Sequence, residues 1–163
     1  MKRFFVCFAM IAMVLMISCG GSDNSCVELN GKTWSAKSED SMSWSQAKDY
    51  CSTLNECEHS DWRLPTVSEL RSLIKNCPAL ETNGPCQVSD SCLSIESDKK
   101  CLENCDNCDP YEENSVLGDD EGLWSSSVRE EEPDAAWYVD FGYGQIGSIY
   151  DDSGFIYNVR CVR

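Results

Sequence analysis

The sequence predicts an α+β domain in which two short helices pack on a small twisted antiparallel sheet. Two capping boxes begin the helices, one at Ser43–Gln46 and one at Thr66–Glu69. From Gly122 to the end of the chain, apolar residues alternate with polar ones between glycine- and aspartate-rich turns, which is typical of β strands. Ten cysteines after residue 25 indicate an exported domain that is stabilised by disulfides.

Each predicted helix has one apolar face. After Thr66 the apolar residues recur with a helical period at Val67, Leu70, Leu73 and Ile74, and Pro78 ends the helix at about Cys77. After Ser43 the corresponding face is formed by Trp44, Ala47, Tyr50, Cys51 and Leu54. We therefore expect the two helices to share a core.

The strands are predicted from alternation and turns. Lys32–Ser35 is expected to form a first strand, and residues 135–141, 146–150 and 155–163 a three-stranded meander. Residues 135–141 should have one apolar face and one mixed face. Trp124 and Trp137 could serve as sugar-stacking platforms, although an aromatic residue in a short strand is more often part of the core.

Residues 1–18 have the features of a bacterial export signal. Lys2 and Arg3 precede an apolar run that is too short to span a bilayer. The run ends in Ser18-Cys19, which resembles a lipobox, so Cys19 is the expected site of lipid attachment. Residues 19–30 should then form a flexible tether. We expect an exported protein that is lipid-anchored to the bacterial envelope, at the outer membrane.

The charge of the chain restricts its partners. Removal of residues 1–18 takes away two of the 13 basic side chains and none of the 28 acidic ones, which makes the net charge −17. Nucleic acids and anionic lipid surfaces are therefore excluded as partners, whereas cationic ligands and divalent ions are compatible with this charge. The acidic run between Asp98 and Asp134 is expected to be a solvated face.

The segment from residue 77 to residue 121 is rich in cysteine and acidic residues and poor in apolar ones. Disulfides are the expected means of ordering such a segment, and a zinc site at Cys101, Cys105 and Cys108 is the alternative. The sequence alone leaves open the partners of Cys26, Cys57, Cys77, Cys86, Cys92, Cys101, Cys105 and Cys108.

Several motifs together resemble one bacterial family, the Lcl C-terminal domain, first seen at the end of collagen-like adhesins. They are residues 43–51, 61–70, 123–127, 136–141 and 157–163, in the order of the family. The implied domain spans residues 31–163, with residues 77–121 as an insertion. More distantly, the pattern is similar to C-type-lectin-like and formylglycine-generating-enzyme folds, and the first of these implies a disulfide between Cys51 and Cys161.

The resemblance to C-type lectins also suggests a ligand site. Glu132-Pro133-Asp134 is similar to the triplet with which some lectins bind calcium and sugar together, and carboxylate oxygens suit calcium. The candidate ligand-binding residues are Trp124, Glu132, Asp134, Trp137 and Asp140, and a weak calcium site would draw on Asp119, Asp120, Glu121, Glu132 and Asp134. No other cofactor is expected.

The adhesin members of the family imply a non-catalytic binding or adhesion module for a glycan or a protein at the cell surface. His59 lies in a predicted loop with no nucleophile nearby in the sequence, which does not favour acid–base chemistry. The alternatives are a structural envelope lipoprotein without a specific ligand and, more remotely, a degenerate oxidase of the formylglycine-generating type.

Overall fold

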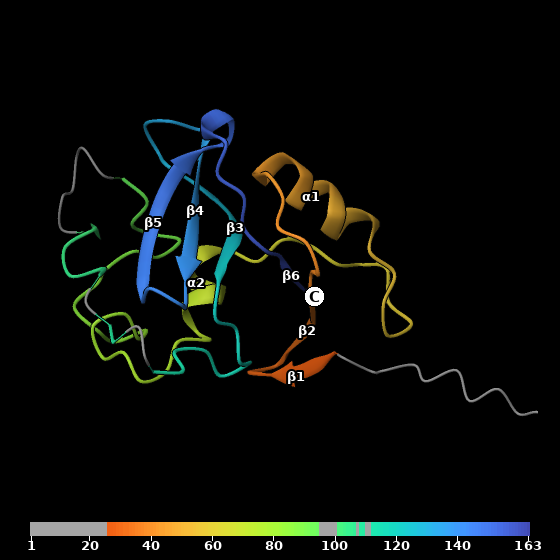
Figure 1. The fold of residues 1–163 in the computed structure, drawn as a ribbon, viewed down its shortest axis with the longest axis horizontal. Helices are drawn as coiled ribbons and strands as arrows, with labels where there is room; N and C mark the ends of the chain where they lie inside the picture. The colour runs from red at the N-terminus through yellow and green to blue at the C-terminus, as the bar shows by residue number, and fades with distance from the viewer. Residues whose placement is uncertain (1–25, 95–100, 107, 110–111) are drawn as a thin grey trace, which may run out of the picture.

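The computed structural model describes residues 26–94, 101–106, 108–109 and 112–163, which form two helices and two three-stranded antiparallel sheets (Figure 1). The elements in chain order are β1 (Val27–Leu29), β2 (Lys32–Lys37), α1 (Trp44–Thr53), α2 (Val67–Arg71), β3 (Gly122–Val128), β4 (Ala135–Asp140), β5 (Gln145–Tyr150), the 3-10 turn η2 (Asp151–Ser153) and β6 (Arg160–Val162). This confirms the α+β class. None of the described helices has the length and hydropathy needed to span a bilayer.

Both predicted capping boxes are present. The Ser43 hydroxyl accepts a hydrogen bond from the amide of Gln46, and the Thr66 hydroxyl accepts one from the amide of Glu69. In return, the side chains of Gln46 and Glu69 accept hydrogen bonds from the backbone amides of Ser43 and Thr66. The predicted end of the second helix was wrong, because α2 stops at Arg71. Beyond it the chain forms tighter i to i+3 bonds, and the Lys75 amide then donates to the carbonyl of Asn114.

The strands divide between two sheets. One sheet has the order β3-β4-β5 and the other β1-β2-β6. The expected meander from residue 135 to residue 163 was therefore wrong in its last strand. The connection after η2 pairs with the segment before α1, through a bridge between Met42 and Tyr157, and this pairing carries β6 to β2. The third strand of the meander is β3 instead.

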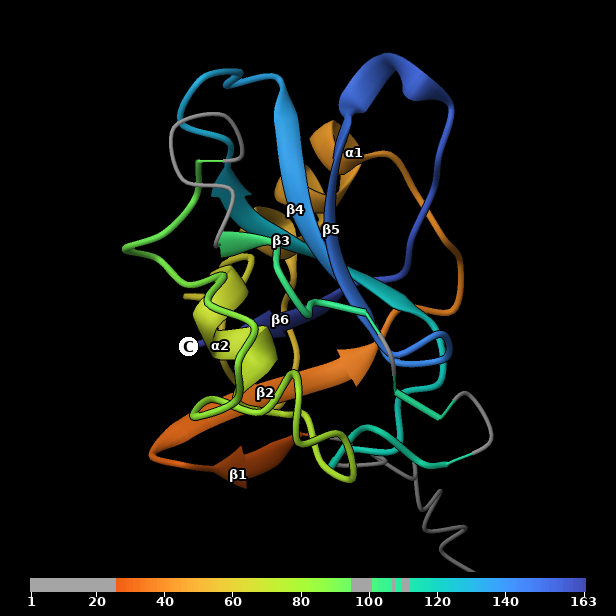
Figure 2. The same cartoon turned by 90° about the vertical axis from the view of Figure 1, so that its left-hand side faces the viewer.

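Strand β4 is buried along its whole length, so the prediction of one apolar and one mixed face was incomplete. Trp137 and Val139 pack in a core that includes residues of α2, such as Val67. Ala136 and Tyr138, on the other face, pack in a second core that includes residues of α1. Figure 2 shows α1 and α2 beside strands β3, β4 and β5. The predicted single shared core is thus two cores with β4 between them.

Covalent links join the beginning of the described chain to its end. Cys51 of α1 is bonded to Cys161 of β6, with Cα atoms 5.6 Å apart, which is the pair that the lectin resemblance implies. Cys26 is bonded to Cys57, with Cα atoms 6.4 Å apart. Because Cys26 is bonded and β1 pairs with β2, residues 26–30 belong to the folded domain, and the tether predicted over residues 19–30 was too long. Residues 1–25, including Cys19, lie outside the described residues.

Three nested disulfides cross-link the described part of the insertion, and they connect Cys77 to Cys108, Cys86 to Cys105 and Cys92 to Cys101. All three cysteines of the alternative zinc site are therefore paired. The insertion also supplies apolar residues to the first core, among them Leu80 and Val88, which are 1% and 0% exposed. It is thus part of the hydrophobic core as well as a cross-linked loop.

A buried arginine holds the first part of the insertion. The guanidinium of Arg71, at the end of α2, donates to the backbone carbonyls of Leu80 (2.6 Å), Glu81 (2.7 Å) and Val88 (2.8 Å), and also to that of Cys86. Burial lowers the pKa of Arg71 below its ordinary value. The four carbonyls supply the polar partners that a buried guanidinium needs.

Candidate binding surfaces

The two candidate sugar-stacking residues are both in the interior. Trp124 and Trp137 are each 0% exposed, in different cores. The Trp124 indole donates to the carbonyl of Met42 (2.8 Å) and packs edge-on against the ring of Tyr157. Neither ring is presented to a ligand, so the interpretation of both as core residues is confirmed and their candidate binding role was wrong.

The acidic residues proposed for calcium do not meet. Asp119, Asp120 and Glu121 precede β3, whereas Glu132 and Asp134 lie in the turn that follows it. A strand of seven residues separates the two groups by roughly 20 Å, at about 3.3 Å per residue. The combined set cannot surround a single ion, so we treat the two ends of β3 as separate surfaces.

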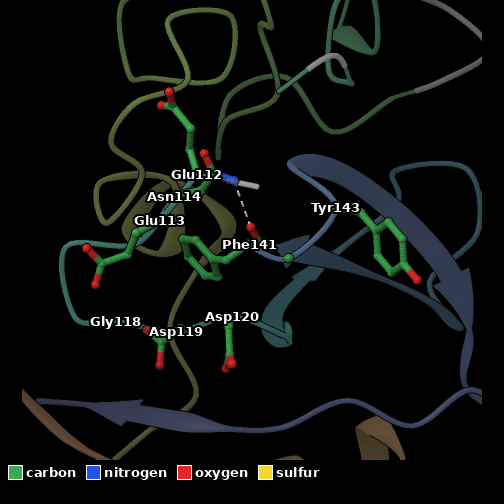
Figure 3. Close-up of a pocket in the computed structure, with 9 residues that line it drawn as sticks. Glu112, Glu113, Asn114, Gly118, Asp119, Asp120, Phe141 and Tyr143 are labelled. Carbon is green, nitrogen blue, oxygen red and sulfur yellow. Dashed lines mark hydrogen bonds between the residues drawn. The ribbon is translucent and has the colours of Figure 1, made fainter. Parts of the chain in front are cut away.

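The first surface is a pocket of about 450 Å³ beside the start of β3 (Figure 3). Its lining includes Glu112, Glu113, Asn114, Asp119, Asp120, Phe141 and Tyr143. The carboxylate of Asp119 accepts from Arg160 (2.6 Å) and is 0% exposed, and Asp120 accepts from Lys37 (3.1 Å). Glu113 pairs with Lys75 (2.7 Å). Most of the acidic side chains in this pocket are therefore already neutralised.

The pKa values at this pocket agree with that pairing. The hydrogen bond from Lys37 lowers the pKa of Asp120. For Lys37, partial burial lowers the pKa, but the hydrogen bonds to Glu121 and Asp120 outweigh it and the pKa is raised. The Asn114 side chain donates to the carbonyl of Phe141 (3.0 Å), as Figure 3 shows, and so contributes to the frame of the pocket.

Asp140 has a local structural role. Its side chain is 8% exposed, and one carboxylate oxygen accepts from the amide of Tyr143 at 2.9 Å. This bond closes the turn between β4 and β5. Asp140 therefore does not join Glu132 and Asp134, which lie at the other end of β4.

The second surface lies where the β3–β4 turn, η2 and the start of α1 meet. We call it the distal face, and define it by the residues that line a pocket of about 550 Å³ together with two exposed neighbours: Ser43, Ser45, Asp134, Tyr150, Asp151, Asp152, Phe155 and Ile156. Of the predicted site residues, only Asp134 lies in this face, and Glu132 supports it from the same turn.

An arginine orders the turn beside this pocket. The Arg129 guanidinium pairs with the carboxylate of Glu132 and donates to the hydroxyl of Ser148 (2.8 Å), which ties the β3–β4 turn to β5. The same group lies over the ring of Tyr150, 5.5 Å from its centroid. The hydrogen bond with Tyr150 lowers the pKa of Glu132 and raises that of Tyr150. Glu132 is therefore engaged in holding the turn.

The sequence analysis missed the apolar part of the distal face. Phe155 and Ile156 are 53% and 57% exposed, and residues 152–156 form a continuous exposed run. Their apolar character was interpreted as the beginning of a strand, but the strand begins only at Arg160. The turn sequence Asp151-Asp152-Ser153-Gly154 is visible in the sequence, but it does not distinguish a strand from an exposed segment after it.

The distal face lies at the opposite end of the domain from β1. In Figure 1 and in Figure 2, which share a vertical axis, η2 and the β3–β4 turn are at the top and β1 is at the bottom. The described chain begins beside β1, at Cys26.

The other candidate groups are structural in this arrangement. His59 forms backbone hydrogen bonds with Glu56, and its ring packs edge-on against Trp62 at 6.3 Å. Cys161 is bonded to Cys51. Among the described residues, one group has the spacing of a metal site, Cys26, Glu56 and Cys57, and its two cysteines are joined in a disulfide.

Comparison with known proteins agrees with the motifs and the fold. The model of the Lcl C-terminal domain matches residues 28–163, which includes both helices, both sheets and the insertion. The comparisons with curated proteins and with solved structures give no match. Because the family model covers most of the chain, this protein belongs to the Lcl C-terminal domain family.

Proposed function

We propose that the protein is a non-catalytic lipoprotein of the cell surface, and that its distal face binds a glycan or a protein at the bacterial envelope. The observation that carries the proposal is the position of this face. Its exposed side chains lie at the end of the domain opposite β1, where the chain from Cys19 would enter. An anchor at Cys19 would hold the domain with this end outward.

The chemistry of the face supports a binding role. Ser43, Ser45 and Asp134 offer hydroxyl and carboxylate groups, and Tyr150 offers an aromatic ring, in one open pocket. Hydrogen-bonding groups beside an aromatic ring are common in surfaces that recognise polar ligands. The first pocket is a weaker candidate, because its carboxylates are largely paired with Lys37, Lys75 and Arg160.

The test is a ligand screen with the full exported chain, oxidised and held in neutral detergent. We expect binding to members of a glycan array or of a panel of envelope proteins. Asp134→Asn with Ser45→Ala should remove that binding without changing the thermal midpoint, because both side chains are exposed. A set of ligands that is unaffected by these substitutions would contradict the role of the distal face. A blank screen would favour a structural envelope protein.

Calcium is a separate question for the same screen. The carboxylates at the two ends of β3 are too far apart for one site, so we expect binding in the presence of a chelator to equal binding in calcium. If binding to every ligand is lost on chelation, the protein is a calcium-dependent lectin. Such a lectin would require an arrangement of carboxylates different from the one described above.

A further inference from the structure

We propose that the distal face docks a basic polypeptide segment that also carries apolar side chains. This proposal rests on the proposed function and narrows its ligand to one class. It is drawn from three properties of the face: unpaired carboxylates, the absence of an available cation among its described neighbours, and a strip of exposed apolar residues.

The carboxylates of the pocket are open to a partner. Asp134 and Asp152 are both exposed, and within the described part of the chain their carboxylates form no ion pair. One oxygen of Asp151 accepts from the amide of Ser45 at 3.2 Å, at the start of α1, and this bond fixes the carboxylate in the pocket wall. Three carboxylates therefore line one pocket, beside the beginning of α1.

The basic side chains beside the distal face already have partners. Arg129 pairs with Glu132, donates to the hydroxyl of Ser148 and lies over the ring of Tyr150. Lys48, on α1, lies over the ring of Trp44, with its amine 3.4 Å from the centroid. Within the described residues, neither side chain forms an ion pair with Asp134, Asp151 or Asp152, and the net charge of −15 for the whole chain favours a basic ligand at longer range.

The apolar strip adjoins the pocket. The bridge between Met42 and Tyr157 is antiparallel, so its register places Ile156 beside Ser43, which is at the rim of the pocket. Phe155 is the next exposed residue along the strip. Tyr150, which is also exposed, comes just before η2 in the chain. A lone amine would use only the carboxylates, and an apolar chain would use only the strip. A segment that combines lysine or arginine with leucine-like residues would use both.

The charge also excludes the opposite class of partner. An anionic glycan, an acidic peptide or an anionic lipid surface would be repelled by Asp134, Asp151 and Asp152 and would find no free cation in the face. Electrostatic attraction to a basic segment would act mainly on the rate of association and would weaken with salt. Salt dependence is therefore part of the prediction.

The experiment measures binding of three synthetic peptides to the full exported chain in neutral detergent: alternating lysine and leucine, alternating glutamate and leucine, and alternating lysine and serine. We expect the first to bind, with affinity falling as salt is raised, the second not to bind, and the third to bind at least about tenfold more weakly. The double substitution Asp134→Asn with Asp152→Asn should lower the affinity for the first peptide by roughly tenfold or more. The double substitution Phe155→Ser with Ile156→Ser should have the same effect. The matched control is Glu58→Gln with Glu103→Gln, which removes the same charge from exposed sites outside both candidate surfaces and should leave the affinity unchanged.

Each contrary result has a definite meaning. If the control lowers the affinity for the lysine–leucine peptide as much as Asp134→Asn with Asp152→Asn does, only net charge matters. That result would overturn the assignment of the peptide site to the distal face. Equal binding of the lysine–serine and lysine–leucine peptides would overturn the role of the apolar strip. If no peptide binds but a neutral glycan still does, and that binding depends on Asp134, the inference fails while the proposed function stands. If neither class binds, both fail.

Discussion

The carboxylate of Asp119, just before β3, is completely buried and accepts two hydrogen bonds from the guanidinium of Arg160 in β6, at 2.6 and 3.2 Å. Arg160 also donates to the carbonyl of Ser35 in β2, at 2.6 Å. One ion pair thus connects the beginning of β3 to the β1-β2-β6 sheet. Asp119 had been a candidate calcium ligand, and this pairing assigns it a structural role instead.

Asp119→Asn should destabilise the domain strongly. The substitution leaves the buried Arg160 charge without its counter-ion, and loss of one member of a buried pair typically costs about 3–5 kcal/mol. Denaturant unfolding of the oxidised protein measures this difference. Asp120→Asn is the matched control, since its carboxylate is exposed and should change the free energy of unfolding by less than about 1 kcal/mol. Similar effects of the two substitutions would show that the buried pair has no special role.

Arg71→Met should loosen the insertion more than the rest of the domain. The side chain keeps much of its apolar volume, but four backbone carbonyls lose their donor, at a cost of roughly 3 kcal/mol or more. Hydrogen exchange should therefore accelerate first in residues 78–90. Arg71→Lys should restore only part of the protection, because an ammonium lacks the planar fork that reaches several carbonyls. Uniform exchange across the domain in Arg71→Met would contradict this role.

Glu69 should contribute to stability in acid. Burial would raise its pKa, but hydrogen bonds from Arg63, from the amide of Thr66 and from Lys32 outweigh burial and lower the pKa to about 2. Because the folded pKa lies below the unfolded value, this stability is complete above about pH 4.5 and is lost as the pH falls towards 2.

Unfolding curves from pH 6 to pH 2 for the wild type and Glu69→Gln measure this contribution. Glutamine preserves the capping geometry, so the difference between the two proteins should shrink by about 2 kcal/mol as the pH falls. A difference that stays constant with pH would show that the carboxylate charge does not stabilise the fold.

Cys19→Ala should release the protein from the membrane. If Cys19 is acylated, labelled fatty acid is incorporated into the wild type and the protein fractionates with the outer membrane, whereas the variant is unlabelled and appears in the soluble fraction. Cys7→Ala is the control, because Cys7 lies inside the expected export signal, and it should leave labelling intact. Labelling of the Cys19→Ala variant would contradict the lipoprotein assignment.

Local features of the fold could be predicted from the sequence, and non-local ones could not. The capping boxes at Ser43 and Thr66 depend on residues three positions apart, and both are present. The pairing of β6 with β2 depends on the path of residues 155–159 across the segment before α1, which no nearby pattern encodes. The same holds for Arg71, whose carbonyl partners are 9 to 17 residues away.

The candidate site shows the same division. Asp134 was a candidate because Glu132-Pro133-Asp134 is similar to the lectin triplet, and it lies in the distal face. Phe155 and Ile156 could not be identified, because an exposed apolar pair looks like the start of a strand until the sheet partners are known. For Trp124 and Trp137 the expectation that an aromatic residue of a short strand belongs to the core is confirmed, and their candidate binding role was wrong.

The most direct test is photo-crosslinking on intact cells, with a photoreactive phenylalanine analogue in place of Phe155 in one strain and in place of Glu58 in another. Both positions are exposed, but only the first lies in the distal face. The proposed binding role predicts a discrete covalent adduct at position 155 that is lost at high salt, and none at position 58. An adduct at position 58 with none at position 155 would contradict it.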